Sequence, residues 1–248
     1  MKTALITGAT SGIGAATAKL LATNGFNLVL CGRSAERLET IQKELSGKVE
    51  VTTARFDVRN RKEVEEALEP ILKNHIIDAL INNAGNAHGL APIQDGDIED
   101  WDAMIDGNVK GLLYVSKPVI KQMVERKSGH IINIGSIAGK EVYPNGNVYC
   151  ASKHAVDAIN NGMRIDLNPY GIKVSQINPG LVNTGFSTVR FKGDTEKADA
   201  TYKGMEPLYA EDIAEVAWFM LSRPAHVNIS DVIVFPTAQA ASTIVKRD

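Results

Sequence analysis

The stretch TGATSGIG, residues Thr7 to Gly14, joins an apolar run of strand character to the first helical pattern of the chain. Gly8 lets the chain turn sharply out of a strand, Gly12 lets the backbone approach a pyrophosphate, and Gly14 lets the helix pack close to the sheet. The free N–H groups and positive dipole end at the start of that helix suit phosphate oxygens. Such glycine spacing is a weak signal alone, but between a first strand and a first helix it predicts a dinucleotide-binding turn. The predicted contacts are Gly8, Thr10, Ser11, Gly12, Ile13 and Gly14.

Short apolar runs alternate with helical patterns along the rest of the chain. The predicted strands are Thr3–Thr7, Asn27–Cys31, Glu50–Phe56, Ile76–Asn82, His130–Gly135, Ile172–Ile177 and Asp231–Phe235. Several are continuously apolar, as strands covered on both faces are. Helical periodicity follows the first strand from Ile13 to Leu21, with a stop at Asn24-Gly25, and recurs from Val64 to Leu72. This alternation predicts an α/β protein with a doubly wound, seven-stranded parallel sheet, as one domain over residues 1–248.

The composition is that of an ordinary soluble globule, with 248 residues, 44% apolar and 23% charged. A net charge of −2 gives no reason to expect nucleic acid or an anionic membrane as a partner. We find neither an apolar run long enough to span a membrane nor the pattern of a signal peptide after Met1. Cys31 and Cys150 lack partners at zinc-ligand spacing, so we expect buried thiols, no metal and a cytoplasmic location.

The second predicted strand ends in LVLCGRS, and this ending bears on the choice of cofactor. NAD sites place a carboxylate here, which binds the ribose 2′-hydroxyl. This chain has Gly32 and then Arg33, whose planar fork of N–H groups can bind a 2′-phosphate. Ser34 and Arg37 are close enough in sequence to assist. We therefore expect NADP(H) rather than NAD(H).

A tyrosine and a lysine four residues apart, Tyr149 and Lys153, share one face of a predicted helix. A free tyrosine has a pKa of about 10, and a neighbouring ammonium stabilises its phenolate. The preceding strand, in HIINIGS, carries Ser136 at its carboxyl end, where ligands of doubly wound sheets bind. We interpret the three residues as an acid–base site.

Together these motifs resemble the short-chain dehydrogenase/reductase family over essentially the whole chain. The matching motifs are TGATSGIG, NNAG (Asn82 to Gly85), NVKG with Asn108, GSIAG with Ser136, YCASK, and NPGLVNT (Asn178 to Thr184). The resemblance implies that Tyr149 is the general acid/base, Ser136 binds the substrate oxygen, Lys153 holds the nicotinamide ribose, and Asn108 anchors a relay water. It also implies cofactor contacts at Asp57, Val58, Asn83, Ala84, Gly85, Pro179, Gly180, Val182 and Thr184.

The segment after NPG, about residues 183–207, is expected to form a substrate lid, and it contains RFKGD (Arg190 to Asp194). GHIINIGS, GNVY, VRFKGD and PAHVNI resemble NADP-dependent 3-hydroxy acid dehydrogenases, with sulfoacetaldehyde reductase as a neighbour. Both substrate types are small aldehydes or alcohols that carry an anion. We expect Arg190, Tyr143 and Gln239 to bind this anion. Gln239 lies in a C-terminal tail of about residues 236–248 and could act within its own chain or across a subunit interface. A solvated loop is the alternative, and Lys192 is expected to be solvated.

The sequence leaves other functions open. A 3-oxoacyl reductase acting on a carrier protein would need a basic patch at the site mouth and an open lid. A non-catalytic NADPH sensor would need no proton donor. The presence of a complete set for proton transfer, Ser136, Tyr149, Lys153 and Asn108, argues against it. The sequence does not choose carboxylate over sulfonate, since both accept the same hydrogen bonds. Family resemblance implies a homotetramer built on two helical regions, about 99–126 and 149–168.

Overall fold

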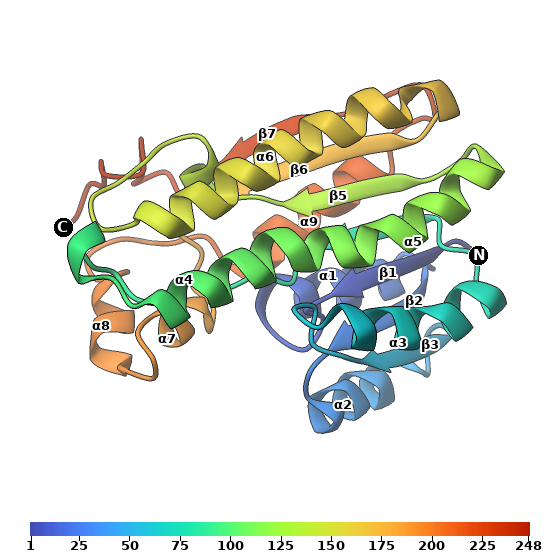
Figure 1. The fold of residues 1–248 in the computed structure, drawn as a ribbon, viewed down its shortest axis with the longest axis horizontal. Helices are drawn as coiled ribbons and strands as arrows, with labels where there is room; N and C mark the ends of the chain where they lie inside the picture. The colour runs from blue at the N-terminus through green and yellow to red at the C-terminus, as the bar shows by residue number, and fades with distance from the viewer.

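The computed structural model describes residues 1–248 and contains one seven-stranded sheet in the order β3-β2-β1-β4-β5-β6-β7 (Figure 1). The strands are β1 (Thr3–Thr7), β2 (Asn27–Gly32), β3 (Val51–Arg55), β4 (Ala79–Asn82), β5 (His130–Ile134), β6 (Lys173–Pro179) and β7 (Asp231–Val234). Every neighbouring pair is parallel. The predicted fold class is confirmed, and the strand order reverses direction between β1 and β4.

Nine α-helices accompany the sheet. They are α1 (Gly12–Thr23), α2 (Ala35–Leu45), α3 (Arg61–Asn74), α4 (Ile98–Ile105), α5 (Gly111–Arg126), α6 (Asn147–Leu167), α7 (Phe186–Arg190), α8 (Thr195–Ala200) and α9 (Ala210–Leu221). A π-helical turn, Asp106–Lys110, joins α4 to α5. Single 3₁₀ turns lie at Ile93–Asp95, Ile137–Gly139 and Asn168–Tyr170.

The core has two layers, one on each face of the sheet. Alternate residues of a strand point to opposite faces, so Ile6 packs in the layer with α1, α2 and α9, whereas Leu5 packs in the layer with α3, α5 and α6. Figure 1 shows α3, α5 and α6 in front of the sheet and α1 and α9 behind it. Burial on both faces explains why the strands read as continuous apolar runs. Cys31 and Cys150 are buried thiols, as predicted.

The region between β6 and α9 includes the segment that the sequence predicted to be a lid, for which it predicted no helix. It contains the short helices α7 and α8, joined by a turn in which Lys192 has φ of 53° and Gly193 has φ of 95°. The Asp194 side chain caps α8 by accepting a hydrogen bond from Lys197 N (3.1 Å). Helices of one or two turns show no readable periodicity, which is why the sequence did not reveal them.

The strand predicted from Ile76 begins only at Ala79. Ile76 is 57% exposed, and Ile77 N donates to the Gln122 side chain (2.9 Å) rather than to a neighbouring strand. No helix combines the length and the apolar character needed to cross a membrane. The acidic, histidine and cysteine side chains form no cluster of three or more that could hold a metal ion.

Candidate active site

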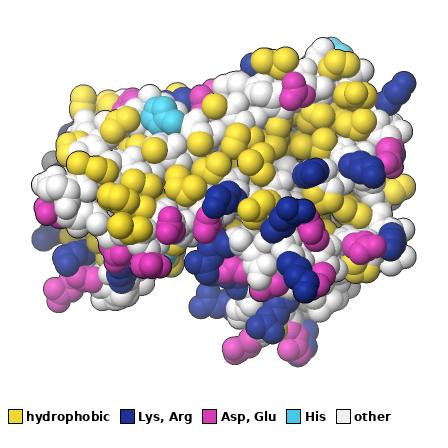
Figure 2. Space-filling model, in the orientation of Figure 1, with side chains coloured by type: hydrophobic (Ala, Val, Ile, Leu, Met, Phe, Trp, Pro, Cys, Tyr) yellow, Lys and Arg dark blue, Asp and Glu magenta, His cyan; other side chains and the backbone are white.

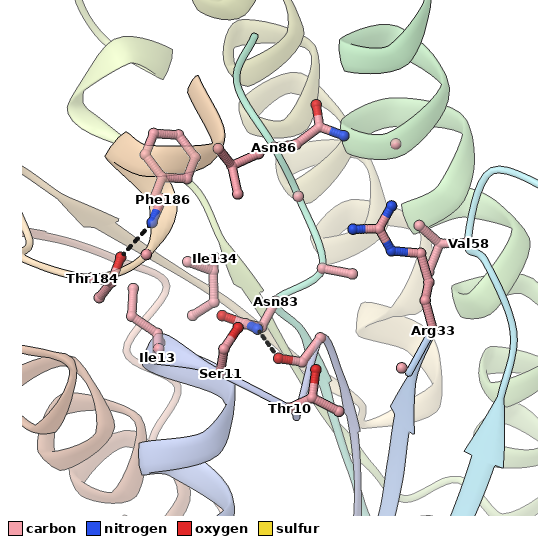
Figure 3. Close-up of a pocket in the computed structure, with 18 of the residues that line it drawn as sticks. Thr10, Ser11, Ile13, Arg33, Val58, Asn83, Asn86, Ile134, Thr184 and Phe186 are labelled. Carbon is pink, nitrogen blue, oxygen red and sulfur yellow. Dashed lines mark hydrogen bonds between the residues drawn. The ribbon is translucent and has the colours of Figure 1, made fainter. Parts of the chain in front are cut away.

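The main cavity lies at the carboxyl ends of the strands, beside the reversal of strand order (Figure 3). Its volume is about 560 Å³, which is typical of a small-molecule or cofactor site, and ligands of doubly wound sheets bind at this point. Of the predicted residues, those lining it are Gly8, Thr10, Ser11, Gly12, Ile13, Arg33, Arg37, Asp57, Val58, Asn83, Ala84, Gly85, Ser136, Tyr149, Lys153, Pro179, Gly180, Val182 and Thr184. The structure therefore brings most of the predicted site together.

The turn between β1 and α1 forms the floor of the cavity, and two of its glycines, Gly8 and Gly14, leave no room for a Cβ. Gly8 has φ of 64°, and a Cβ there would lie 2.8 Å from the Asn83 side chain. A Cβ on Gly14 would lie 2.3 Å from the Gly8 carbonyl oxygen, so Gly14 packs behind the turn rather than lining the cavity. Ser11, at the start of α1, makes no capping bond with its side chain. The helix N–H groups remain open to the cavity, as phosphate oxygens require.

Residues after β4 brace this turn. Asn83 Nδ2 donates to the carbonyl oxygens of Thr7 (2.9 Å) and Gly8 (3.2 Å), as Figure 3 draws in part. The Thr7 hydroxyl accepts from the backbone N–H groups of Asn83 (3.0 Å) and Ala84 (2.9 Å). The two strand ends on either side of the reversal are thus tied together, and the floor is rigid before any ligand binds.

Arg33 lines the far end of the cavity, beyond the end of β2 (Figure 3), and Arg37 also lines the cavity. Ser34 does not line it, and its hydroxyl caps α2 by accepting from Arg37 N (3.3 Å). Asp57 and Arg59 lie beside Arg33, and both line the cavity. Arg59 was not among the site residues predicted from the sequence. Its place two residues after Asp57 was visible, but not the direction of its side chain.

Tyr149 and Lys153 lie on α6 and are both buried, at 8% and 7% exposed. Lys153 Nζ donates to the Ile134 carbonyl oxygen (2.9 Å) at the end of β5. Burial lowers the pKa of Lys153 to about 8. Ser136 follows β5 and accepts a bond from Ala138 N (3.1 Å), which orients its hydroxyl at the cavity wall. The three predicted acid–base residues thus share one wall.

Burial raises the pKa of Tyr149, and the positive charge of Arg190 and a hydrogen bond with Ser136 oppose this rise. The charge predicted from the sequence to stabilise the Tyr149 phenolate was that of Lys153. In the structure Arg190 has this effect, and its guanidinium carbon lies 4.7 Å from the centroid of the Tyr149 ring. Tyr149 is therefore protonated near neutral pH, the form in which it can donate a proton.

Asn108 lies in the π-helical turn, fully buried and outside the cavity lining. Its Oδ1 accepts from Asn86 N (2.7 Å), and its Nδ2 donates to Asn86 O (2.8 Å) and to the Ser152 hydroxyl (3.0 Å). The side chain predicted to anchor a relay water thus makes three bonds within the protein. These bonds fix Asn86, which lines the cavity and which the sequence analysis missed. π-Helical turns often occur at functional sites.

Gln239 does not line the cavity of its own chain, so its predicted substrate contact is not made within one subunit. It is 5% exposed. Its Oε1 accepts from Leu181 N (2.8 Å) and its Nε2 donates to Ala241 O (3.1 Å). A Cβ on Gly180 would meet this side chain at 2.3 Å. Gln239 therefore holds the loop after β6 against the C-terminal tail.

Arg190, at the end of α7, lies among aromatic rings. Its Nη2 donates to the Tyr143 hydroxyl (2.8 Å), and its guanidinium carbon is 5.3 Å from the Phe186 ring centroid. Its Nε is buried without a hydrogen-bond partner, and no acidic side chain pairs with it. Arg190 and Tyr149 both line a second cavity of about 130 Å³, and Tyr149 also borders the main one. A cation with an unused donor thus lies beside the tyrosine.

Lys192 has a different partner from Arg190. Its Nζ lies 3.2 Å from Asp97 and 3.0 Å from Asp100, which belong to the α4 region. This pair of contacts joins the turn after α7 to α4. Of the two cations in RFKGD, only Arg190 faces the tyrosine. Three further residues that the sequence analysis missed, Phe186, Thr188 and Val189, line the main cavity from α7.

Comparison with known proteins gave consistent matches. The family model described as short chain dehydrogenase matches residues 2–194. The NADP-dependent 3-hydroxy acid dehydrogenase of Salmonella typhi is 46% identical over 238 residues, covering 95% of each chain. Sulfoacetaldehyde reductase 2 of Chromohalobacter salexigens is 43% identical over 247 residues, covering 98% of each. The closed form of serine dehydrogenase complexed with NADP+ has a TM-score of 0.92 at 42% identity, covering 99% of this chain and 100% of that one.

Proposed function

Because this chain belongs to the short-chain dehydrogenase family, we propose that it is an NADP(H)-dependent oxidoreductase that interconverts a small aldehyde bearing an anionic group and the corresponding alcohol. The relatives named above act with NADP or on sulfoacetaldehyde, as their names state. When bound, the nicotinamide cofactor supplies the hydride in reduction and accepts it in oxidation.

The residues that line the main cavity fit such a cofactor. The glycine turn and the start of α1 supply N–H groups for the pyrophosphate. Arg33 and Arg37 supply guanidinium groups at the end where a 2′-phosphate would bind. Asn83 to Gly85, Pro179, Gly180, Val182 and Thr184 supply the remaining walls. Lys153, with its ammonium held at the Ile134 carbonyl, is close enough to the cavity to bind a ribose hydroxyl.

Tyr149 is the proposed proton donor in reduction and proton acceptor in oxidation. Positioned acid–base groups of this kind contribute about 10²- to 10⁴-fold to a rate. Ser136, oriented by its bond from Ala138 N, is placed to bind the substrate oxygen and orient it toward the Tyr149 hydroxyl. Burial keeps Tyr149 protonated and thus able to donate. A sensor protein would not need this arrangement, which favours an enzyme.

The environment of Arg190 is the observation that supports an anionic substrate. A guanidinium with a buried, unpartnered Nε is costly unless something accepts from it, and a carboxylate or sulfonate is a matching acceptor. Tyr143 accepts from Arg190 Nη2 and so holds the guanidinium beside Tyr149, although Tyr143 itself lines neither cavity. The position of Arg190 over Tyr149 would put that anion a few bonds from the reacting carbon.

The smaller cavity has an acidic wall, which opposes binding of an anionic substrate and which Lys192 partly neutralises. Asp95, Asp97 and Asp100 line this cavity and would repel an anion. Lys192 binds the carboxylates of Asp97 and Asp100 and neutralises part of this charge, whereas Asp95 has no cationic partner. The same contacts hold the turn after α7 on α4, so we propose that residues 183–207 act as a closed lid. A closed lid fits a small acid better than a carrier-bound 3-oxoacyl group.

We also propose that the chain acts as one domain and assembles into a homotetramer. Figure 2 shows hydrophobic side chains gathered over the face that carries α4, α5 and α6. On these helices Ile98 is 64% exposed, Leu113 is 41% and Ile165 is 68%. Apolar surface of this kind favours association with a partner. Light scattering of the purified protein would test the tetramer.

The function is tested by following NADPH absorbance with malonic semialdehyde, sulfoacetaldehyde and succinic semialdehyde side by side. Oxidation of NADPH by any of these aldehydes that is lost in Tyr149→Phe supports the enzyme, and the three kcat/KM values rank carboxylate against sulfonate. Absence of turnover with all three, in a protein that still binds NADPH, would support the sensor instead.

A further inference from the structure

An acidic side chain lies beside Arg33 at the end of the main cavity where the cofactor phosphate is proposed to bind. Asp57 Oδ2 is 3.9 Å from Arg33 Nη1, and the Asp57 side chain is only 22% exposed. Figure 3 shows Arg33 reaching into this end of the cavity next to Val58, the residue after Asp57. A carboxylate this close to Arg33 competes with any phosphate for the guanidinium.

Arg59 holds this carboxylate more closely than Arg33 does. Its Nε donates to both carboxylate oxygens of Asp57 (3.1 Å each), and its Nη2 donates to Oδ2 (2.7 Å). Its backbone N also donates to Oδ1 (3.0 Å). Partial burial raises the pKa of Asp57, but the hydrogen bonds from Arg59 outweigh it and hold the pKa below its usual value. Asp57 is thus ionised, with both oxygens engaged by one residue.

The net positive charge at this end of the cavity matches the negative charge of a phosphate only when Arg59 is included. The charged side chains lining it are Arg33, Arg37, Arg59 and Asp57, which leave a net charge of about +2. A phosphate monoester carries about −1.5 to −2 at neutral pH. Without Arg59 the balance falls by one charge, and Asp57 is left with Arg33 as its nearest cation.

We propose that Arg59 is a specificity-determining residue for a 2′-phosphorylated cofactor, because it binds the Asp57 carboxylate and so keeps Arg33 available for the phosphate. The inference rests on the proposed use of NADP(H). Arg59 acts through Asp57 and Arg33 and is a positioning residue. The alternative is that Arg59 only stabilises the turn before α3. These two roles predict different results for cofactor binding.

The test is calorimetric binding to the whole protein of two cofactor fragments, adenosine 2′,5′-bisphosphate and 5′-AMP. We expect Arg59→Gln to weaken binding of the bisphosphate by about ten-fold or more, and binding of 5′-AMP by less than about two-fold. Arg61→Gln is the matched control, because Arg61 is 68% exposed on its side chain, bonds to Glu65 and does not line the cavity. Equal losses for both fragments would mean a structural role and overturn the inference.

A double-mutant cycle with Asp57→Asn separates the indirect role from direct phosphate contact. Without the carboxylate there is no competitor for Arg33, so Arg59→Gln should then change bisphosphate binding by less than about three-fold. A loss that persists at ten-fold in the Asp57→Asn background would mean that Arg59 itself contacts the phosphate, contrary to the proposal. If the unaltered protein binds both fragments equally, the proposed NADP(H) use fails instead.

Discussion

Replacing Arg190 by alanine tests whether the lid recognises an anion. The guanidinium lies among Tyr143, Tyr149 and Phe186, with Nε buried and no acidic partner. A charge-assisted hydrogen bond contributes about 1.5–3 kcal/mol, more than the 0–1 kcal/mol of an exposed ion pair. Because about 1.4 kcal/mol corresponds to ten-fold, Arg190→Ala should lower kcat/KM for malonic semialdehyde by roughly 10- to 100-fold.

The assay compares malonic semialdehyde with propanal, a neutral aldehyde of the same length. Loss of Arg190 also removes a charge that lowers the pKa of Tyr149, but both substrates experience that change equally, so it cancels in the ratio of their kcat/KM values. Measurement in the reduction direction limits the effect further, because Tyr149 is then already in its protonated, donating form.

Two variants sharpen the result. Lys197→Ala removes a cation from the same lid, but its side chain is 69% exposed and pairs with Asp194, so the acid-to-neutral ratio should not change. Arg190→Lys should recover only part of the loss, because an ammonium lacks the planar fork. An unchanged ratio in Arg190→Ala would refute the reasoning and leave RFKGD as a lid turn without a role in substrate choice.

Three further outcomes are expected. Arg33→Ala should weaken NADPH binding by about 10- to 100-fold and leave NADH binding nearly unchanged, as fluorescence titration would detect; equal losses would contradict the phosphate assignment. Tyr149→Phe should lower kcat by at least about 100-fold while NADPH still binds, and more than a tenth of normal activity would exclude Tyr149 as the proton donor. Lys153→Met should abolish activity yet raise the free energy of unfolding without cofactor at pH 7 by about 2 kcal/mol, since burial of the ammonium costs about 3 kcal/mol and its hydrogen bond returns about 1 kcal/mol. The pKa of Lys153 in the folded protein is lowered to about 8, so the cost of burying its ammonium is full below pH 8 and disappears as pH rises towards the unfolded pKa of about 10.4. Urea unfolding at pH 7 and 9.5 would show a smaller difference in unfolding free energy between Lys153→Met and the unaltered protein at the higher pH. A variant less stable than the unaltered protein at pH 7 would contradict this prediction.

The sequence predicted the features that depend on local pattern. Strands covered on both faces are apolar throughout, and Tyr149 and Lys153 are one helical turn apart, so both were readable without a structure. The glycines of TGATSGIG were readable for the same reason, because Gly8 and Gly14 leave no room for a Cβ. These features need only neighbours along the chain.

The features that the sequence could not supply depend on contacts between distant segments. The surroundings of Arg190 come from the turn before α6, from α6 and from α7. Gln239 was expected at the substrate, but Leu181 and Ala241 use its amide. Asn108 makes three bonds to Asn86 and Ser152. Which donor meets which acceptor over such separations is decided by packing, which sequence spacing does not encode.

The central claim, that this protein reduces small aldehydes with an anionic end, is tested most directly by the specificity of the unaltered protein. The measurement is kcat/KM with NADPH for malonic semialdehyde and for propanal, under the same conditions. The position of Arg190 beside Tyr149 predicts a preference for the acid of at least about ten-fold, equivalent to about 1.4 kcal/mol. A ratio near one, or a preference for propanal, would contradict the account.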